Sequence, residues 1–292
     1  MANVMVLNQN SGENWATYNA DVVEGMRGIP DGTVDYSIFS PPFASLYTYS
    51  ASDRDMGNVR DFREFGHHFR FLLKDLLRAT RPGRLCSQHC MNLPTSKSRD
   101  GFIGITDFRG MIIRWMQRAG WIYHSEVVIW KDPVTAMQRT KALGLLHKQL
   151  RKDSAMSRQG IPDYLVTFRR PGDNSKPVAH DGDEYPVSKW QRMASPVWMD
   201  INPSDTLQYR SAREHEDEKH ICPLQLEVIR RAVGLWTAPG DTVLSPFAGI
   251  GSEGYVSLEM GRRFVGFELK RSYYEQMVRN LESVQRQSVL FV

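Results

Sequence analysis

The chain has 292 residues, of which 24% are charged and 41% hydrophobic. These proportions exclude a disordered, collagen-like or disulfide-stapled protein, and the length suits one large α/β domain or a domain with an inserted lobe. No apolar run approaches the roughly 18–20 residues that cross a bilayer, and the N-terminal segment lacks the features of a secretory signal. The sequence therefore predicts a soluble intracellular protein. Its three cysteines are too few for a disulfide framework, and its net charge of +4 is mild.

The first 130 residues alternate between strand and helix patterns. Residues 33–39 alternate in hydrophobicity and stop at a double proline, which is typical of a strand. Residues 61–79 place phenylalanine and leucine at helical spacing, and Arg81-Pro82-Gly83 ends that helix. The patterns that follow predict a strand at 85–89, a helix at 105–118 and a strand at 121–130.

Regular patterns are lost between residues 133 and 213 and return at residue 224. The sequence then predicts a helix at 224–236, a strand at 242–244, a helix at 252–260, a strand at 263–267 and a helix at 271–285. Strands that alternate with helices are typical of an open parallel sheet. We therefore expect residues 1–132 and 214–292 to form one α/β domain and residues 133–213 to form an inserted region.

Basic residues gather in the middle of the chain. Residues 131–176 contain ten basic and four acidic side chains, a net charge of +6, which leaves −2 for the rest of the chain. A polyanion partner would require a positive field concentrated in this way. Charge alone leaves a solvated basic surface as the other interpretation.

A glycine-rich turn lies between a predicted strand and a predicted helix. Gly249, Gly251 and Gly254 match the spacing G-x-G-x-x-G, and Glu268 lies nineteen residues beyond the first glycine, at the end of the next predicted strand. Glycines let the backbone approach a ligand closely, and an acid at that place can accept both ribose hydroxyls. The pattern favours an adenosine-containing cofactor over the alternative, a tight turn followed by an unrelated surface glutamate.

The place of this turn along the chain bears on which cofactor it holds. Only 24 residues follow Glu268, too few for the second mononucleotide-binding half that a dinucleotide site needs. The remaining strands must come from upstream, so the order fits a permuted sheet better than a nicotinamide-dependent dehydrogenase.

Ser40-Pro41-Pro42-Phe43 follows the strand predicted at 33–39, at the end where open α/β sheets bind ligands. The two prolines fix φ and remove N–H groups, so the local carbonyls can serve as acceptors. The Ser40 side chain and the Pro41 carbonyl could accept the hydrogens of an exocyclic amine, while Phe43 stacks on the ring. The alternative is a strand-ending turn with a core phenylalanine.

The two motifs together resemble those of a known family. Ser40-Pro41-Pro42-Phe43, followed far downstream by S-P-F-A-G-I-G at 245–251, resembles the DNA amino-methyltransferases of the N4-cytosine/N6-adenine family in their permuted, β-type order. In that family the S/D/N-P-P-Y/F motif comes first, the target-recognition region second and the S-adenosylmethionine loop last. Further matches at 19–35, 81–84, 120–131 and 219–225 extend the resemblance to about residues 15–131 and 196–285.

This resemblance implies a fold, a cofactor and a set of site residues. The fold is an open, mostly parallel, seven-stranded sheet of the S-adenosylmethionine-dependent methyltransferase type, and S-adenosyl-L-methionine is the cofactor. The catalytic residues are Ser40, Pro41, Pro42 and Phe43. The cofactor-binding residues are Asp21, Lys219, His220, Ser245, Pro246, Phe247, Ala248, Gly249, Gly251 and Glu268, with Ser245 where the family usually has an aspartate.

The basic segment falls where the family has its target-recognition region, so residues 133–213 are expected to recognise DNA. The expected DNA-binding residues are Arg139, Lys141, Lys148, Arg151 and Lys152. The expected partner is double-stranded DNA, with the target base flipped out because a base inside a duplex cannot reach such a pocket. No membrane partner is expected, and a homodimer is left open. The expected location is the cytoplasm of a bacterial cell, or of the host cell if a phage encodes the protein.

The activity implied by the resemblance is methyl transfer to an exocyclic amine of DNA in a restriction-modification setting. N4 of cytosine is favoured over N6 of adenine, because in the family a serine at the position of Ser40 more often accompanies cytosine enzymes. Three alternatives stay open: a methyltransferase acting on RNA or a protein amide, an inactive DNA-binding module of the same fold, and a nicotinamide-dependent oxidoreductase.

Cys86, His89 and Cys90 form the pattern C-x-x-H-C. Structural zinc needs four converging ligands, and no second ligand pair lies nearby in the sequence. We therefore assign no metal site and expect these side chains to pack in a strand.

Overall fold

The computed structural model describes residues 6–42, 62–140, 144–208 and 223–290, and it leaves the side chains of 137–140 and 287–290 undescribed. The strands of the large sheet are β1 (Val6–Ser11), β2 (Trp15–Ala20), β3 (Val34–Phe39), β4 (Thr80–Met91), β7 (Ile122–Ile129), β8 (Asp163–Arg169), β9 (Val197–Trp198), β10 (Thr242–Ser245) and β11 (Arg263–Glu268). A small antiparallel pair is formed by β5 (Leu93–Pro94) and β6 (Ile105–Thr106).

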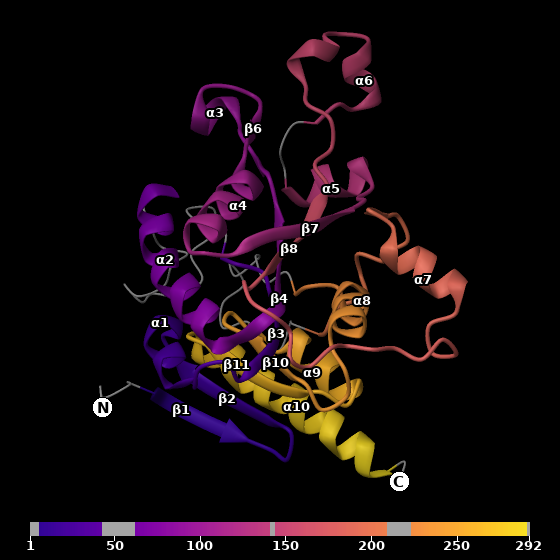
Figure 1. Ribbon diagram of the computed structural model, residues 1–292. Coiled ribbons are helices and arrows are strands. Elements are labelled where there is room, and N and C mark those ends of the chain that lie inside the picture. Colours follow the sequence, from indigo (N-terminus) through magenta and orange to yellow (C-terminus); the bar gives the residue numbers. More distant parts are fainter. Residues whose placement is uncertain (1–5, 43–61, 141–143, 209–222, 291–292) are drawn as a thin grey trace.

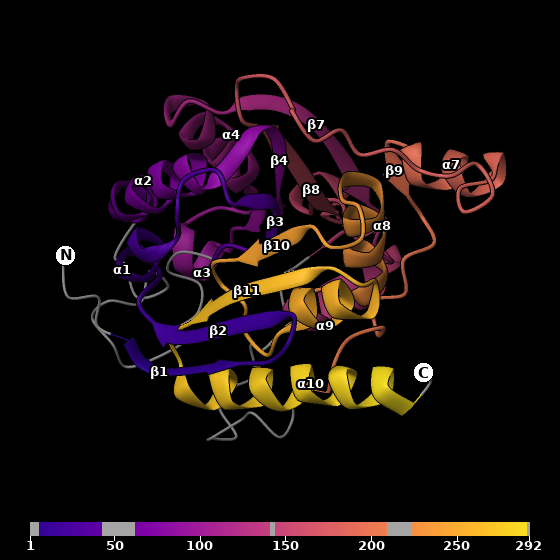
Figure 2. The ribbon, with the colours of Figure 1, turned by 60° about the horizontal axis from the view of Figure 1, so that its bottom comes forward.

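The nine strands of the large sheet lie in the order β1-β2-β11-β10-β3-β4-β8-β7-β9 (Figure 2). The five neighbours from β2 to β4 are parallel. β1 is antiparallel to β2, and β8 is antiparallel to both β4 and β7. The carboxyl ends of the five parallel strands therefore meet at one edge, together with the end of β7 and the beginning of β8.

Helices cover both faces of the sheet (Figure 1). One face carries α1 (Val22–Gly25), α2 (Phe62–Ala79) and α4 (Phe108–Arg118), and the other carries α8 (Leu226–Trp236), α9 (Ser252–Glu259) and α10 (Arg271–Leu290). The connections hold α3 (Lys97–Asp100), α5 (Pro133–Thr140), α6 (His147–Leu150), α7 (Val187–Ala194) and the 3-10 turns Met26–Gly28 and Ser154–Met156. Among the described residues, none of these helices combines the length and apolar character needed to span a membrane.

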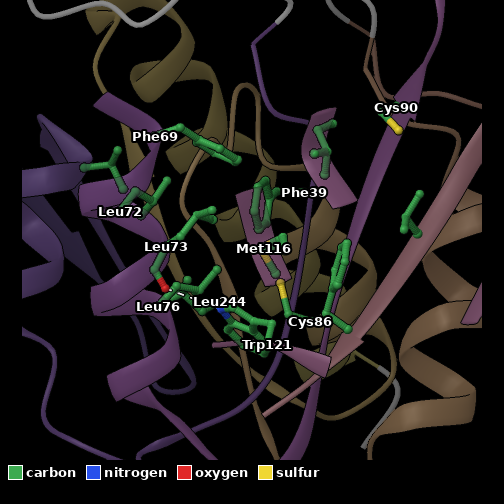
Figure 3. Packing of buried hydrophobic residues seen from close by; sticks show 14 of the residues in the cluster. Phe39, Phe69, Leu72, Leu73, Leu76, Cys86, Cys90, Met116, Trp121 and Leu244 are labelled. Carbon is green, nitrogen blue, oxygen red and sulfur yellow. Dashed lines mark hydrogen bonds between the residues drawn. The ribbon is translucent and has the colours of Figure 1, made fainter. Parts of the chain in front are cut away.

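The α2 side of the core follows from helical spacing. Phe69, Leu72, Leu73 and Leu76 recur at intervals of one, three and four residues and are fully buried. Figure 3 shows them packed toward the sheet, around Phe39 and the side chains of α4. This packing fixes β3, and with it the position of Ser40 at the end of that strand.

Most elements agree with the sequence analysis. The strands predicted at 33–39, 85–89, 121–130, 242–244 and 263–267, and the helices predicted at 61–79, 105–118, 224–236, 252–260 and 271–285, are all present with ends shifted by up to five residues. The largest shifts are at the start of β4, which includes Arg81-Pro82-Gly83, and at the end of α10. The large sheet has two more strands than the seven expected, because β1 and β9 are added at its edges. The sequence analysis also did not assign the N-terminal hairpin of β1 and β2.

The predicted inserted region needs one correction. Residues 163–169 and 197–198 lie within 133–213 but belong to the large sheet: they form β8, which pairs with β4 and β7, and β9, which pairs with β7. Most residues of β8 are buried, so its sequence lacks the alternation of a half-exposed strand, and basic and glycine-rich segments on both sides obscured it. Residues 133–162, which we call the arm, therefore leave the sheet after β7 and return to it at β8.

Candidate active site

The two sequence motifs lie side by side at one edge of the sheet. Ser40 follows β3 and the glycine turn follows β10, and these strands are parallel neighbours in which Ser37 pairs with Leu244. Phe39 contacts Phe247 of the turn, with ring centroids 5.8 Å apart. Open α/β sheets bind ligands beyond the carboxyl ends of their strands. The fold therefore joins residues from distant parts of the chain in one candidate site.

The three glycines of the turn have different structural roles. Gly249 has φ +53°, and a Cβ placed there would meet no atom within 4 Å. Gly251 has φ +87°, and its Cβ would lie 2.8 Å from Met277 Cγ on α10. A Cβ on Gly254 would lie 2.6 Å from the ring of Phe264 on β11. The first glycine thus leaves open space beside the backbone, while the other two permit close packing of α9.

The carboxylate of Glu268, at the end of β11, holds the glycine turn. Oε2 accepts a hydrogen bond from the Gly249 N–H at 2.9 Å, and Oε1 accepts one from the Lys270 N–H at 2.7 Å. From the adjacent β2, Asn19 Nδ2 donates to the carbonyls of Glu268 and Leu269 at 2.8 and 2.9 Å. The acid that the sequence analysis assigned to the cofactor therefore lies against the turn.

A second carboxyl group lies close to this one. Glu253, in the first turn of α9, is buried. Burial raises the pKa of Glu253 to about 8, and the negative charge of Glu268 raises it further than burial alone would. Near neutral pH Glu253 is therefore largely protonated. The sequence analysis did not assign a role to Glu253, because its burial depends on how α9 packs.

Polar groups around the turn fit an adenosine-containing cofactor. The Oγ atoms of Ser245 and Ser252 are buried and have no hydrogen-bond partner among the described residues. Such atoms are rare in native proteins and call for a ligand or a water molecule. With the open side of Gly249, they fit S-adenosylmethionine, which supplies a methyl group carried on a positively charged sulfur.

The other predicted cofactor-binding residues do not all lie in the glycine turn. Pro246 and Ala248 are buried in the turn. Asp21 follows β2 at the same edge and caps α1, where its Oδ1 accepts hydrogen bonds from the N–H groups of Val23 and Glu24 at 2.8 and 3.3 Å. Lys219, His220 and the predicted stacking residue Phe43 lie outside the described residues.

Ser40 begins a chain of polar side chains that crosses the sheet. Its Oγ lies 3.0 Å from His89 Nδ1, and His89 Nε2 lies 3.1 Å from Asp163 Oδ2. Lys131 Nζ lies 2.5 Å from the same Asp163 oxygen. Asp163 is 2% exposed, His89 is 9% exposed, and Ser40 is half-buried. We call these four residues the polar chain.

Strand register explains the polar chain. Phe39 pairs with Gln88, so Ser40 lies beside His89 where β3 ends. Asp163 pairs with Met91 on β4 and with Ile129 on β7, which places it diagonally opposite both His89 and Lys131 on one face of the sheet. Four neighbouring strands thus contribute one side chain each.

Asp163 is ionised despite its burial. Burial alone would raise the pKa of this carboxyl group, but the electrostatic interactions with His89 and Lys131 and the hydrogen bonds from both outweigh it, so the pKa lies below its ordinary value. The buried carboxylate therefore acts only as a hydrogen-bond acceptor.

The sequence analysis missed the polar chain as a unit. His89 entered it only as a candidate metal ligand, Asp163 only as a charge of the basic segment, and Lys131 as a charge of that segment and as the end of the family match at 120–131. Cys86 and Cys90 are buried on β4, where burial raises the pKa of both thiols. A detectable signal was present: His89 is the last residue of one predicted strand and Lys131 follows another, and both strands point to the same edge of the sheet.

The predicted DNA-binding residues lie on the arm. Figure 1 shows α5 and α6 extending away from the sheet beyond β7 and β8. Lys148, Arg151 and Lys152 are exposed on α6 and the turn after it. Arg139 lies in α5 with its side chain outside the described residues, and Lys141 lies outside them altogether.

Comparison with known proteins finds similarity over most of the chain. Type II methyltransferase M.BglII of Bacillus subtilis is 23% identical over 271 residues, which cover 88% of this chain. The chain spans 66% of the length of M.BglII, just under two thirds.

Two solved structures share the fold. The protein TTHA0409 of Thermus thermophilus, complexed with S-adenosyl-L-methionine, has a TM-score of 0.67 and 20% identity, with 90% of this chain and 91% of that chain covered. PvuII DNA methyltransferase (cytosine-N4-specific) has a TM-score of 0.68 and 15% identity, with 97% and 94% covered. The N6_N4_Mtase family model, described as DNA methylase, matches residues 34–279 and so includes both motifs and the polar chain. The chain therefore belongs to the N6_N4_Mtase family of DNA methylases.

Proposed function

We propose that this protein is an S-adenosylmethionine-dependent DNA methyltransferase that acts on the exocyclic amine of a flipped-out base, with N4 of cytosine as the favoured acceptor. The observation that carries the proposal is the position of Ser40. This side chain lies at the end of β3, directly beside the strand that leads into the glycine turn, and it is only half-buried.

Methyl transfer to an exocyclic amine requires little from the protein beyond positioning of the reactants and electrostatic stabilisation. The amino nitrogen of cytosine or adenine is conjugated with its ring and is a poor nucleophile. Hydrogen bonds from the amine to Ser40 Oγ and the Pro41 carbonyl would draw its hydrogens to one side and direct its lone pair at the methyl group. Phe43 is the proposed stacking partner of the base.

The arm is the proposed DNA-binding element. It carries exposed basic side chains and leaves the sheet at the active-site edge, between β7 and β8. The target base would leave the duplex to enter the site, and stacking would offset part of the energy of unstacking. Since DNA is the proposed substrate, we propose the bacterial cytoplasm as the location, or the host cell for a phage protein; a homodimer is a further proposal.

Two alternative functions share the fold and part of the proposed site. Methylation of N6 of adenine would use the same amine acceptors and differ only in the base that the pocket admits. An inactive DNA-binding module would keep the fold without turnover. The open side of Gly249, and the Oγ atoms of Ser245 and Ser252 that have no partner within the described part of the chain, favour an enzyme that binds the cofactor.

The deciding experiment is incubation of the protein with methyl-labelled S-adenosylmethionine and DNA, followed by digestion and mass spectrometry of the nucleosides. We expect N4-methylcytosine. N6-methyladenine would change the base assignment and keep the mechanism, whereas 5-methylcytosine would overturn both. Cofactor binding in calorimetry without any methylated nucleoside would favour the inactive module.

A further inference from the structure

The polar chain fixes where the hydrogen of the Ser40 hydroxyl lies. Asp163 is ionised and can only accept, so the hydrogen between it and His89 belongs to Nε2. A neutral imidazole with its hydrogen on Nε2 has a lone pair on Nδ1. While His89 is neutral, the Ser40 hydroxyl therefore donates to its Nδ1, across the 3.0 Å separation.

This arrangement makes Ser40 an acceptor toward the substrate. A free serine hydroxyl can donate or accept, and a donated hydrogen would repel the hydrogens of an incoming amine. With its own hydrogen on His89, Ser40 Oγ presents only lone pairs on its open side. The opposite tautomer of His89 would donate to Ser40 and turn the hydroxyl hydrogen toward the base.

Methylation of an amine also releases a proton. Two electrons of the exocyclic nitrogen form the new N–C bond, the pair of the broken S–C bond stays on sulfur, and the nitrogen is left with one hydrogen too many. We propose that Ser40, His89 and Asp163 form a relay that takes up this proton, a role that rests on the proposed methyltransferase function. The proton passes from nitrogen to Ser40 Oγ as the Ser40 hydrogen passes to His89 Nδ1, and solvent later removes it from the imidazolium.

Lys131 sets the charge balance of the relay. It contacts the same carboxylate oxygen as His89, so the negative charge of Asp163 is already balanced while His89 is neutral. When His89 gains the proton, the carboxylate lies 3.1 Å from the new positive charge. Among the described residues, the Cys90 thiol of β4 interacts electrostatically with Asp163, and the Arg109–Glu126 ion pair of α4 and β7 lies near Cys90. His89 acts through Ser40 and is therefore a positioning residue.

Substitutions at His89 distinguish its proposed uptake of a proton from a role limited to orienting the Ser40 hydroxyl. Asparagine keeps an acceptor for the Ser40 hydroxyl but takes up no proton, so His89→Asn and His89→Ala should both lower kcat at least about 100-fold, with little change in KM for DNA. Asp163→Asn should do the same, because an amide donor at this place favours the other tautomer. The control is His68→Asn, at an exposed histidine of α2. If His89→Asn keeps more than about a tenth of the native kcat, the relay is overturned and His89 only orients Ser40.

Two further measurements do not depend on the size of the rate change. The first is nitrogen-15 spectroscopy of histidine-labelled protein without cofactor, in which the signals that disappear in His89→Asn are those of the His89 ring. These signals should have the chemical shifts of the tautomer with hydrogen on Nε2, and Asp163→Asn should change those shifts. The native kcat should fall at acid pH, and the residual kcat of His89→Asn should lack that decrease. The Nδ1–H tautomer, or an unchanged pH profile in His89→Asn, would contradict the relay. A native protein that methylates no DNA would instead refute the proposed function, while the spectra would still test the hydrogen bonds.

Discussion

At the scale of single residues, the Ser40 hydroxyl is the group whose removal most directly tests the chemistry. We expect Ser40→Ala to lower kcat on the order of 100-fold, because the lost hydrogen bond matters most as the amine rehybridises in the transition state. DNA binding should change little. Steady-state kinetics with a gel-shift assay measures both, and Ser98→Ala on the exposed surface of α3 is the control. Equal losses of affinity and kcat would assign Ser40 to binding.

Glu268 is the residue that tests the cofactor site. Loss of its carboxylate should leave the fold intact and weaken S-adenosylmethionine binding by about 2–3 kcal/mol, since charge-assisted hydrogen bonds are lost. The measurement is calorimetry on Glu268→Ala, with Glu275→Ala on the exposed face of α10 as the control. Unchanged affinity would mean that the cofactor lies elsewhere.

The sequence predicted the parts of this site that are contiguous in the chain. Ser40-Pro41-Pro42 and the glycine turn each carry their chemistry in neighbouring residues, and Glu268 has a fixed spacing from Gly249. The polar chain has no such local signature, because His89, Lys131 and Asp163 meet only through the register of β4, β7 and β8. Burial of Glu253 likewise depends on tertiary packing.

At the scale of elements, periodicity identified the helices and the alternating strands, since each has one face against the core. It failed for β8, most of which is buried, and for the hairpin of β1 and β2. β1 is largely exposed, so its hydrophobic contrast is weak. The family, the fold class and the S-adenosylmethionine cofactor of the family, all expected from the two motifs, are confirmed.

The arm is the element whose role charge reversal can test. Reversal of Lys148, Arg151 and Lys152 to glutamate should abolish DNA binding and leave cofactor affinity unchanged. The matched control reverses Arg27, Arg118 and Arg263, which are exposed near the opposite edge of the sheet. For the native protein, log affinity should fall steeply with log salt because phosphate contacts release counterions. A flat salt dependence measured by fluorescence anisotropy would count against this role of the arm.

At the scale of the whole molecule, the buried carboxyl group of Glu253 links stability to pH. Its folded pKa of about 8 lies above its ordinary value of 4.5, so between these values the folded state holds a proton that the unfolded chain releases. The free energy of unfolding should therefore fall as pH rises through this range, on the order of 1 kcal/mol per pH unit. Glu253→Gln should remove this slope.

Chemical denaturation of both proteins at several pH values between 5 and 8 would measure the difference. Glu259→Gln, on an exposed side chain of the same helix, should keep the native slope. Parallel pH dependences for Glu253→Gln and the native protein would show that Glu253 is ionised in the folded state.

Ile129 at the end of β7 pairs with Asp163 at the start of β8, and this pairing affects how the arm can change in sequence and length. Because the arm starts and ends at neighbouring strands, its two ends stay together whatever lies between them. Doubling the length of such a loop costs only about 0.6 kcal/mol in closure entropy, so replacement or enlargement leaves the sheet nearly untouched. Lys131 and Asp163 mark the limits of such an exchange, since both belong to the polar chain. Replacement of residues 133–162 by the corresponding segment of a relative is thus the smallest exchange that could transfer a preference for a DNA sequence without changing the catalytic residues.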